Sequence, residues 1–223
     1  MYVCISNANR KMIHSPHIYY APDVNNVIFY TLNADESNHA IRVMRQRKGD
    51  AVKLADGKGN IYLGEIIDAH PKKCTIAIKE MRNHVEKRTH YLHIAIAPPK
   101  NMDRLIFFIE KTTEIGIDEI TPLICEHSER RLVNHERLEQ IIVSAMKQSE
   151  RYYKPLLNKI TRLEDVLKKI SKSAGHKFIG QLTKDPSPSL NYCYEKGSKA
   201  IVLIGPEGDF TSTEILQAVK AGC

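Results

Sequence analysis

The sequence predicts an α/β protein with a small amino-terminal β-barrel and a carboxyl-terminal domain of alternating strands and helices. Residues 18–82 hold short β-branched and aromatic runs separated by turn residues, which is typical of a small barrel. From Leu92 onward, apolar runs alternate with amphipathic stretches, which favours a parallel sheet covered by helices. A polar stretch between them indicates a linker. We therefore expect domains at residues 1–85 and 86–223, with residues 1–15 as a disordered extension.

The barrel strands are expected at 17–21, 26–32, 51–56, 61–67 and 74–81. A glycine-rich turn at 56–60 predicts a hairpin between the third and fourth of these strands. Ser37 is placed to cap a short helix over 38–47, which ends before Gly49.

In the second domain, strands are expected at 92–97, 118–124, 177–182 and 200–205, and helices at about 103–115, 134–153 and 163–170. A last helix begins at Thr211, because Thr211 and Glu214 have the spacing of a capping box. Gly116 is expected to end the first of these helices.

Charge and cysteine usage bound the class of partner. The chain has 33 Lys and Arg against 26 Asp and Glu, a net charge of +7, which suits a polyanionic partner but is weak evidence alone. Its five cysteines form no C-x-x-C pair, which indicates free thiols in a reducing cytoplasm. Two H-x-x-H pairs have no third ligand pattern, so no metal site is expected. No apolar run matches a membrane span or signal peptide, and we expect a cytoplasmic protein without a membrane partner.

The stretch Ile201 to Phe210 is the most informative one. A buried strand is followed by Gly205-Pro206-Glu207-Gly208 and then by the capped helix, an arrangement that often holds a ligand at the carboxyl edge of an α/β sheet. Glycines there would let the backbone approach a nucleotide-like ligand. An ordinary strand-to-helix turn is the competing interpretation. Dinucleotide and phosphate-loop fingerprints do not occur, so nucleotide phosphates are not the expected ligand.

Two helical segments admit both a functional and a structural interpretation. In EKTTEIG, Lys111 either meets an RNA phosphate or belongs to a solvated charged face. In the long helix, Ser144, Gln148 and Arg151 share a polar stripe beside two tyrosines. Such a stripe can read an unstacked RNA base, or it can be an ordinary amphipathic helix end.

A basic cluster near the barrel helix is open to the same two interpretations. Phosphate binding and a solvated surface explain it about equally well. Its members are Arg42, Arg45, Arg47 and Lys48.

Four segments, taken in this order, resemble the ribosomal RNA small subunit methyltransferase E family, a branch of the SPOUT methyltransferases. They are HAIRVMRQRKGDAVKLADGKGNIY, EKTTEIGIDEITPL, AMKQSERYYKP and LIGPEGDFTSTEI. The resemblance covers about residues 18–223. It implies a PUA-like RNA-binding barrel and a SPOUT domain with a carboxyl-terminal trefoil knot, acting as a homodimer.

The resemblance also implies the reaction. Family members transfer a methyl group from S-adenosylmethionine to N3 of one uridine in the decoding region of 16S ribosomal RNA, the RNA of the small ribosomal subunit. A rival hypothesis from another class is a non-catalytic RNA-binding or ribosome-assembly protein on the same fold.

By the resemblance, three loops build the cofactor pocket. The first two map onto Leu182, Thr183, Leu203, Ile204, Gly205, Pro206, Glu207 and Gly208. The third has the pattern L-G-x-R-I-L-R-x-E-T-A after the helix that begins at Thr211, and this pattern does not occur in the 223 residues. We therefore expect a chain truncated in its knot tail, with weak cofactor binding or none. Asp209 replaces a glycine usual in the family, a change that matters if the position needs a positive φ.

The chemistry requires no covalent nucleophile, because uracil N3 itself attacks the methyl group once its proton is removed. Positioning and electrostatics then supply most of the rate. We expect Arg151 to hold the uracil or stabilise its anion, and Glu207 to contact the ligand or help remove the proton. The RNA-binding residues expected are Arg42, Arg45, Arg47, Lys48, Lys111, Gln148 and Arg151.

Overall fold

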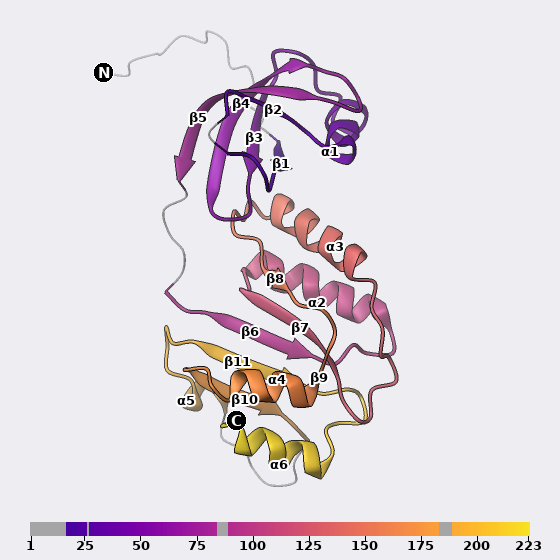
Figure 1. The fold of residues 1–223 in the computed structure, drawn as a ribbon, viewed down its shortest axis with the longest axis vertical. Coiled ribbons are helices and arrows are strands. Elements are labelled where there is room, and N and C mark those ends of the chain that lie inside the picture. Colours follow the sequence, from indigo (N-terminus) through magenta and orange to yellow (C-terminus); the bar gives the residue numbers. More distant parts are fainter. Residues whose placement is uncertain (1–16, 26, 84–88, 183–188) are drawn as a thin grey trace, which may run out of the picture. The chain divides into compact units, whose positions relative to one another are not determined.

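The computed structural model describes residues 17–25, 27–83, 89–182 and 189–223. The chain divides into two compact units, Met1–His84 and Val85–Cys223 (Figure 1). The expected extension at 1–15 lies outside the described residues. Within the described part, no helix is long and apolar enough to cross a membrane.

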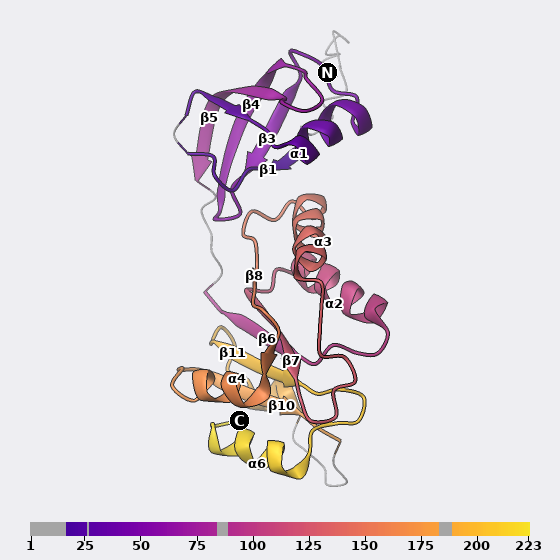
Figure 2. The same cartoon turned by 45° about the vertical axis from the view of Figure 1, so that its right-hand side comes forward.

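The first unit is a five-stranded sheet that forms a half-barrel (Figure 2). Its strands are β1 (Ile18–Tyr20), β2 (Phe29–Thr31), β3 (Ala51–Ala55), β4 (Asn60–Asp68) and β5 (Thr75–Asn83), with the helical turns α1 (Ala34–Asn38) and η1 (His39–Val43). The strand order is β1-β3-β4-β5-β2. The predicted β-rich domain is thereby confirmed, and the expected hairpin is the antiparallel β3–β4 pair.

The start of the short helix differs from the sequence-based prediction. Asn33, and not Ser37, is the N-cap, since the Asn33 side chain accepts a hydrogen bond of 2.8 Å from the Glu36 N–H. Ser37 is fully buried inside α1, and its hydroxyl donates to the Leu32 carbonyl at 3.0 Å. Ser37 therefore fastens α1 to the core, and the helical segment stops at Val43.

The second unit is a parallel sheet with helices on both faces, as predicted (Figures 1 and 2). Its elements are β6 (Leu92–Ile96), α2 (Met102–Ile115), β7 (Glu119–Ile124), α3 (His135–Gln148), β8 (Leu156–Leu157), β9 (Thr161–Arg162), α4 (Leu163–Ile170), β10 (His176–Gly180), α5 (Leu190–Cys193), β11 (Ala200–Ile204) and α6 (Ser212–Lys220). The strand order is β10-β11-β6-β7-β8, and β9 also pairs with β7.

Alternation along the strands divides the core into two layers. Ala95, Leu123 and Leu203 belong to the cluster that packs under α4 and α6. Ile94 and Ile120 belong to the cluster under α2 and α3. Because all the strands run in one direction, the segments that follow them emerge together at the carboxyl edge, and the segments that precede them lie at the opposite, amino edge.

The helix expected to reach Tyr153 is shorter. α3 ends at Gln148, and Glu150 has a left-handed backbone with φ of 51°. The Arg151 N–H then donates back to the Met146 carbonyl at 2.9 Å, which closes the helix end. Arg151 therefore lies beyond the helix, and the polar stripe on α3 ends at Gln148.

Candidate functional site at the carboxyl edge

The segment after β11 forms the centre of the candidate site. The predicted capping box is present, with the Thr211 side chain accepting from the Glu214 N–H and the Glu214 carboxylate accepting from the Thr211 N–H. Before it, Gly205 packs closely on an aromatic ring, because a Cβ on this residue would lie 3.0 Å from ring carbons of Phe210. Phe210 is buried in the layer under α4 and α6, so it fixes the path of the glycine loop.

Asp209 connects this loop to the one after β10. Its φ is 58°, so the position does require a positive φ, which L-residues adopt at a cost in backbone strain. Its carboxylate offsets that cost by accepting the Leu182 N–H at 2.8 Å and the Phe210 N–H at 2.8 Å. A glycine could not make these contacts. The expected first and second cofactor loops are thus joined through an aspartate side chain.

Glu207 connects the same loop to the one after β6. Its Oε1 accepts the Lys100 N–H at 2.8 Å, although the side chain is exposed. This hydrogen bond holds the pKa of the Glu207 carboxyl below its usual value. An ionised carboxylate already occupied by an N–H is a weak proton acceptor. The geometry therefore favours loop holding over proton removal for Glu207.

His127, on the loop after β7, completes the framework. Its Nδ1 lies 2.9 Å from the Gly208 carbonyl and 3.1 Å from the Asp209 carbonyl. Carbonyl oxygens only accept, so Nδ1 carries the proton and donates. These hydrogen bonds raise the pKa of His127. Gly208 and His127 lie close together, since a Cβ on Gly208 would lie 3.1 Å from the Cβ of His127.

The remaining expected cofactor residues differ in exposure. Leu203 is fully buried in the core, so its side chain packs and only its main chain leads into the loop. The Ile204 carbonyl accepts the Ala97 N–H at 2.9 Å, and Pro206 is buried. Leu182 is 88% exposed beside the loop, and Thr183 lies outside the described residues.

A second group of expected residues lies at the amino edge. Arg151 is exposed, and its Nε donates to the Glu114 carbonyl at 2.9 Å, at the end of α2. The Lys111 ammonium contacts the carboxylates of Glu110 and Glu114, both at 2.8 Å. Gln148 is exposed at the end of α3. The paired charge on Lys111 favours the solvated-face interpretation for that residue.

One chain does not bring Arg151 and Glu207 together. Glu207 binds the main chain just before α2, and Arg151 binds the main chain at the other end of α2. α2 has 14 residues, and a helix of that length is about 20 Å long. The two expected catalytic residues therefore lie at opposite ends of this helix.

The basic cluster of the first unit is exposed as a whole. Its four members follow one another along η1 and the turn before β3, where Arg45 has a positive φ of 55°. They are Arg42, Arg45, Arg47 and Lys48. This arrangement fits contacts with phosphates as well as a solvated surface.

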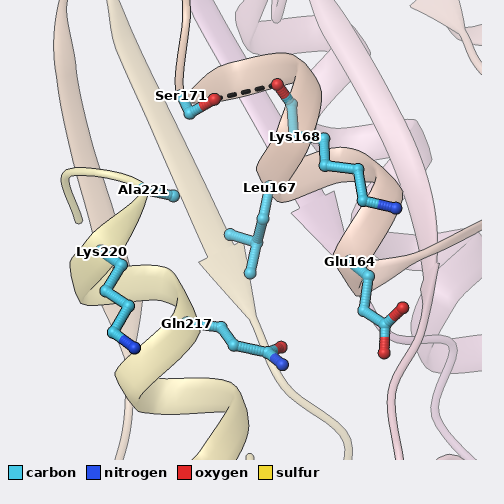
Figure 3. Close-up of a pocket in the computed structure, with 7 residues that line it drawn as sticks. All are labelled: Glu164, Leu167, Lys168, Ser171, Gln217, Lys220 and Ala221. Carbon is cyan, nitrogen blue, oxygen red and sulfur yellow. Dashed lines mark hydrogen bonds between the residues drawn. The ribbon is translucent and has the colours of Figure 1, made fainter.

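A groove of about 440 Å³ lies between α4 and α6 of the second unit (Figure 3). It is lined by Glu164, Leu167, Lys168, Ser171, Gln217, Lys220 and Ala221. None of the expected site residues lines it, and its charges are of both signs. In the described part of the chain, no group of three or more His, Cys, Asp or Glu could hold a metal ion.

Sequence reasoning missed Lys100 and His127, which hold the glycine loop in place. A signal was available, because both follow strands that the sequence predicts to be parallel. The segments after neighbouring parallel strands meet at one edge of the sheet. Their contacts use a main-chain N–H and an imidazole, which no motif marks.

Comparison with known proteins agrees with this architecture. Residues 86–223 match the RNA methyltransferase domain family, and residues 32–79 match the RNA methyltransferase PUA domain family. Because the first match covers more than half of the chain, the protein belongs to the RNA methyltransferases.

Individual relatives narrow the family. A probable rRNA methyltransferase from Porphyromonas gingivalis is 33% identical, with a TM-score of 0.81 over 92% of this chain and 86% of that one. The ribosomal RNA small subunit methyltransferase E of Rickettsia conorii is 29% identical over 187 residues, 82% of this chain and 75% of that protein. The chain is a member of the ribosomal RNA small subunit methyltransferase E family.

One solved structure shares the fold at lower identity. The ribosomal RNA small subunit methyltransferase E from Neisseria gonorrhoeae, bound to S-adenosyl methionine, is 22% identical. Its TM-score is 0.80, with 93% of this chain and 86% of that chain covered.

Proposed function

We propose that this protein uses S-adenosylmethionine to methylate N3 of a uridine in the decoding region of 16S ribosomal RNA. Methylation of ribosomal RNA follows from the family, while the base atom and the position in the RNA rest on the resemblance of the four segments. The structural observation that carries the proposal is the loop Gly205–Gly208, which the side chains of Glu207, Asp209 and His127 fasten to three neighbouring segments.

The residues at the carboxyl edge fit this cofactor. The loop is partly exposed at Gly205 and exposed at Gly208, and the exposed Leu182 beside it offers an apolar surface for an adenine ring. Leu182 and the Gly205–Gly208 main chain would hold the cofactor. When bound, S-adenosylmethionine supplies an electrophilic methyl group.

The chain's own residues then orient the uracil and stabilise its charge. A guanidinium donates hydrogen bonds to carbonyl oxygens, so Arg151 is suited to hold the uracil edge and stabilise the anion that forms when N3 loses its proton to solvent water. Glu207 keeps the loop in place. Since Arg151 and Glu207 lie at opposite ends of α2, we infer a homodimer in which Arg151 of one subunit serves the loop of the other.

The proposal includes a trefoil knot at the cofactor loops, a cytoplasmic location and a role in ribosome biogenesis, all implied by the resemblance. The third loop pattern does not occur in residues 1–223. We therefore propose that a polypeptide of these residues binds S-adenosylmethionine weakly.

Mass spectrometry of 16S ribosomal RNA tests the reaction. RNA from cells that lack the gene is expected to lose N3-methyluridine in the decoding region, and reintroducing the gene is expected to restore it. An unchanged level of N3-methyluridine would refute the proposed specificity. Calorimetric titration with S-adenosylmethionine separates the enzyme from the non-catalytic RNA-binding alternative, which predicts no heat of binding at any cofactor concentration.

A further inference from the structure

The loop after β7, which contains His127, also contains two neighbouring arginines. Arg130 and Arg131 line a groove of about 370 Å³ together with Lys100, Glu129 and Leu132. None of these residues belongs to the expected cofactor or RNA-binding set. The groove lies at the carboxyl edge, where Lys100 is also the residue whose N–H binds Glu207.

Two hydrogen bonds hold the turn that precedes the two arginines. The buried Ser128 hydroxyl accepts the Cys125 N–H at 2.9 Å, and His127 binds the Gly208 carbonyl. The Nη2 of Arg130 donates to the Lys100 carbonyl at 3.0 Å. The guanidinium of Arg130 is therefore fixed relative to the glycine loop, which is the requirement for positioning a substrate.

The charges of these arginines are not neutralised within the described residues. Glu129 is the acidic residue of the groove, and its carboxylate pairs with the Lys100 ammonium at 3.2 Å. Arg131 directs its Nη2 and Nε to the carbonyls of Glu126 and Ser128, at 3.4 and 3.5 Å. Neither guanidinium takes part in an ion pair among the described residues.

The Nε of Arg130 is closed to solvent, so a ligand would approach this arginine through its Nη atoms. A guanidinium donates charge-assisted hydrogen bonds to the oxygens of a phosphate.

From this geometry we propose that Arg130 and Arg131 bind backbone phosphates of the ribosomal RNA and hold the target nucleotide at the cofactor loops. The inference rests on the proposed function and extends it, because it assigns RNA contacts to the second unit at the carboxyl edge. The contacts are to phosphate, so they position the RNA and carry no base specificity.

Salt dependence of RNA binding tests this inference. Affinity for protein-free 16S ribosomal RNA is measured at several salt concentrations for the full chain, the double variant Arg130→Gln/Arg131→Gln and the control Arg137→Gln. Arg137 is an exposed arginine on α3 outside the groove. Each lost phosphate contact lowers the log–log salt slope by about 0.7, so the double variant is expected to show a slope smaller by about 1.4. The control Arg137→Gln removes one general surface charge and is expected to keep the slope of the parent protein.

Two further measurements complete the test. If circular dichroism shows that the double variant unfolds at a lower temperature than the parent protein, Arg131→Gln alone is used. Its expected loss in the salt slope is about 0.7. A groove variant whose slope and affinity equal those of Arg137→Gln overturns the inference. If the groove variants show the smaller slope but the parent protein transfers no methyl group, the phosphate contacts are supported and the proposed function is contradicted.

Discussion

The two edges of the parallel sheet use polar residues in opposite ways. At the carboxyl edge, Glu207, Asp209 and His127 bind main-chain groups of neighbouring loops and remain at least partly exposed to solvent. At the amino edge, His93 and Glu119 are buried, with 5% and 8% of their surfaces exposed. The carboxyl edge is thus a shaped surface open to a ligand, and the amino edge is a polar core that joins strands.

The amino-edge cluster satisfies its own polar groups. Glu119 accepts hydrogen bonds from the Tyr91 hydroxyl and from Asn158 Nδ2, the latter at 2.6 Å. Thr121 Oγ1 accepts from Asn158 at 2.7 Å and contacts His93 Nε2 at 2.8 Å. Because these residues come from β6, β7 and the segments beside them, the cluster fixes their register. We therefore propose that cofactor binding depends on the carboxyl edge, and that the buried cluster of the amino edge contributes to stability.

The largest expected effect is on stability. Glu119→Ala removes the acceptor of the Tyr91 hydroxyl and one of the two acceptors of Asn158 Nδ2. Breaking such a buried group is expected to lower the free energy of unfolding by about 3 kcal/mol. Urea unfolding measures this loss. The control Glu110→Ala removes a partly exposed carboxylate and is expected to change the free energy of unfolding by less than about 1 kcal/mol. Equal losses in both variants would mean that the amino edge is no special source of stability.

Asp209→Ala gives an intermediate effect at the other edge. It removes the acceptor of the Leu182 and Phe210 N–H groups and keeps the positive φ, so we expect a loss of about 2 kcal/mol in unfolding free energy and weaker binding of S-adenosylmethionine. Asp209→Asn retains an acceptor oxygen and is expected to lose less of both. Calorimetry and urea unfolding measure the two quantities. Identical behaviour of the variants would show that the carboxylate does not join the loops.

Glu207→Gln separates loop holding from proton removal. A glutamine oxygen can still accept the Lys100 N–H, so methyl transfer is expected to stay within about threefold of the parent rate, whereas loss of a general base would lower it by about 100-fold or more. Single-turnover methylation of ribosomal RNA across a range of pH measures the difference. A 100-fold loss would restore Glu207 to the role of base.

The smallest effect is on pH dependence, and its sign differs between the edges. Hydrogen bonds to carbonyls raise the pKa of His127 above 6.5, so its contribution to stability is present below pH 6.5 and is lost as pH rises through the raised pKa. Burial lowers the pKa of His93 below 6.5, so its contribution is present above pH 6.5 and is lost as pH falls through the lowered pKa. An NMR titration of the two imidazoles checks both directions. Titration of both on the same side of 6.5 would contradict the contrast.

The alternation of elements was readable from the sequence because it depends on local patterns. Apolar runs such as 200–205, the capping box at Thr211 and the turn at 56–60 each act within a few residues. The helix ends were harder to predict. Asn33, and not Ser37, is the cap, because Ser37 is buried inside α1, and the left-handed Glu150 ends α3 before Tyr153.

The site could be predicted only in part, because its contacts join residues that are far apart in the sequence. The glycines at 205 and 208 are a local signal, and Asp209 could be noted as a departure from the family. That Asp209 binds the Leu182 N–H, and that Glu207 binds the Lys100 N–H, depends on loops 27 and 107 residues away. Contacts with main-chain groups at such separations leave no mark in the sequence of either partner.

NMR mapping of cofactor binding tests the contrast between the edges most directly. S-adenosylmethionine at millimolar concentration is added to the isotope-labelled chain, and amide shifts are followed residue by residue. We expect the largest shifts at Leu182, at 203–209 and at Lys100, with the amides of His93 and Glu119 unmoved. Shifts centred on His93, Glu119 or Arg151 of the same chain, with the glycine loop unaffected, would contradict the assignment of binding to the carboxyl edge.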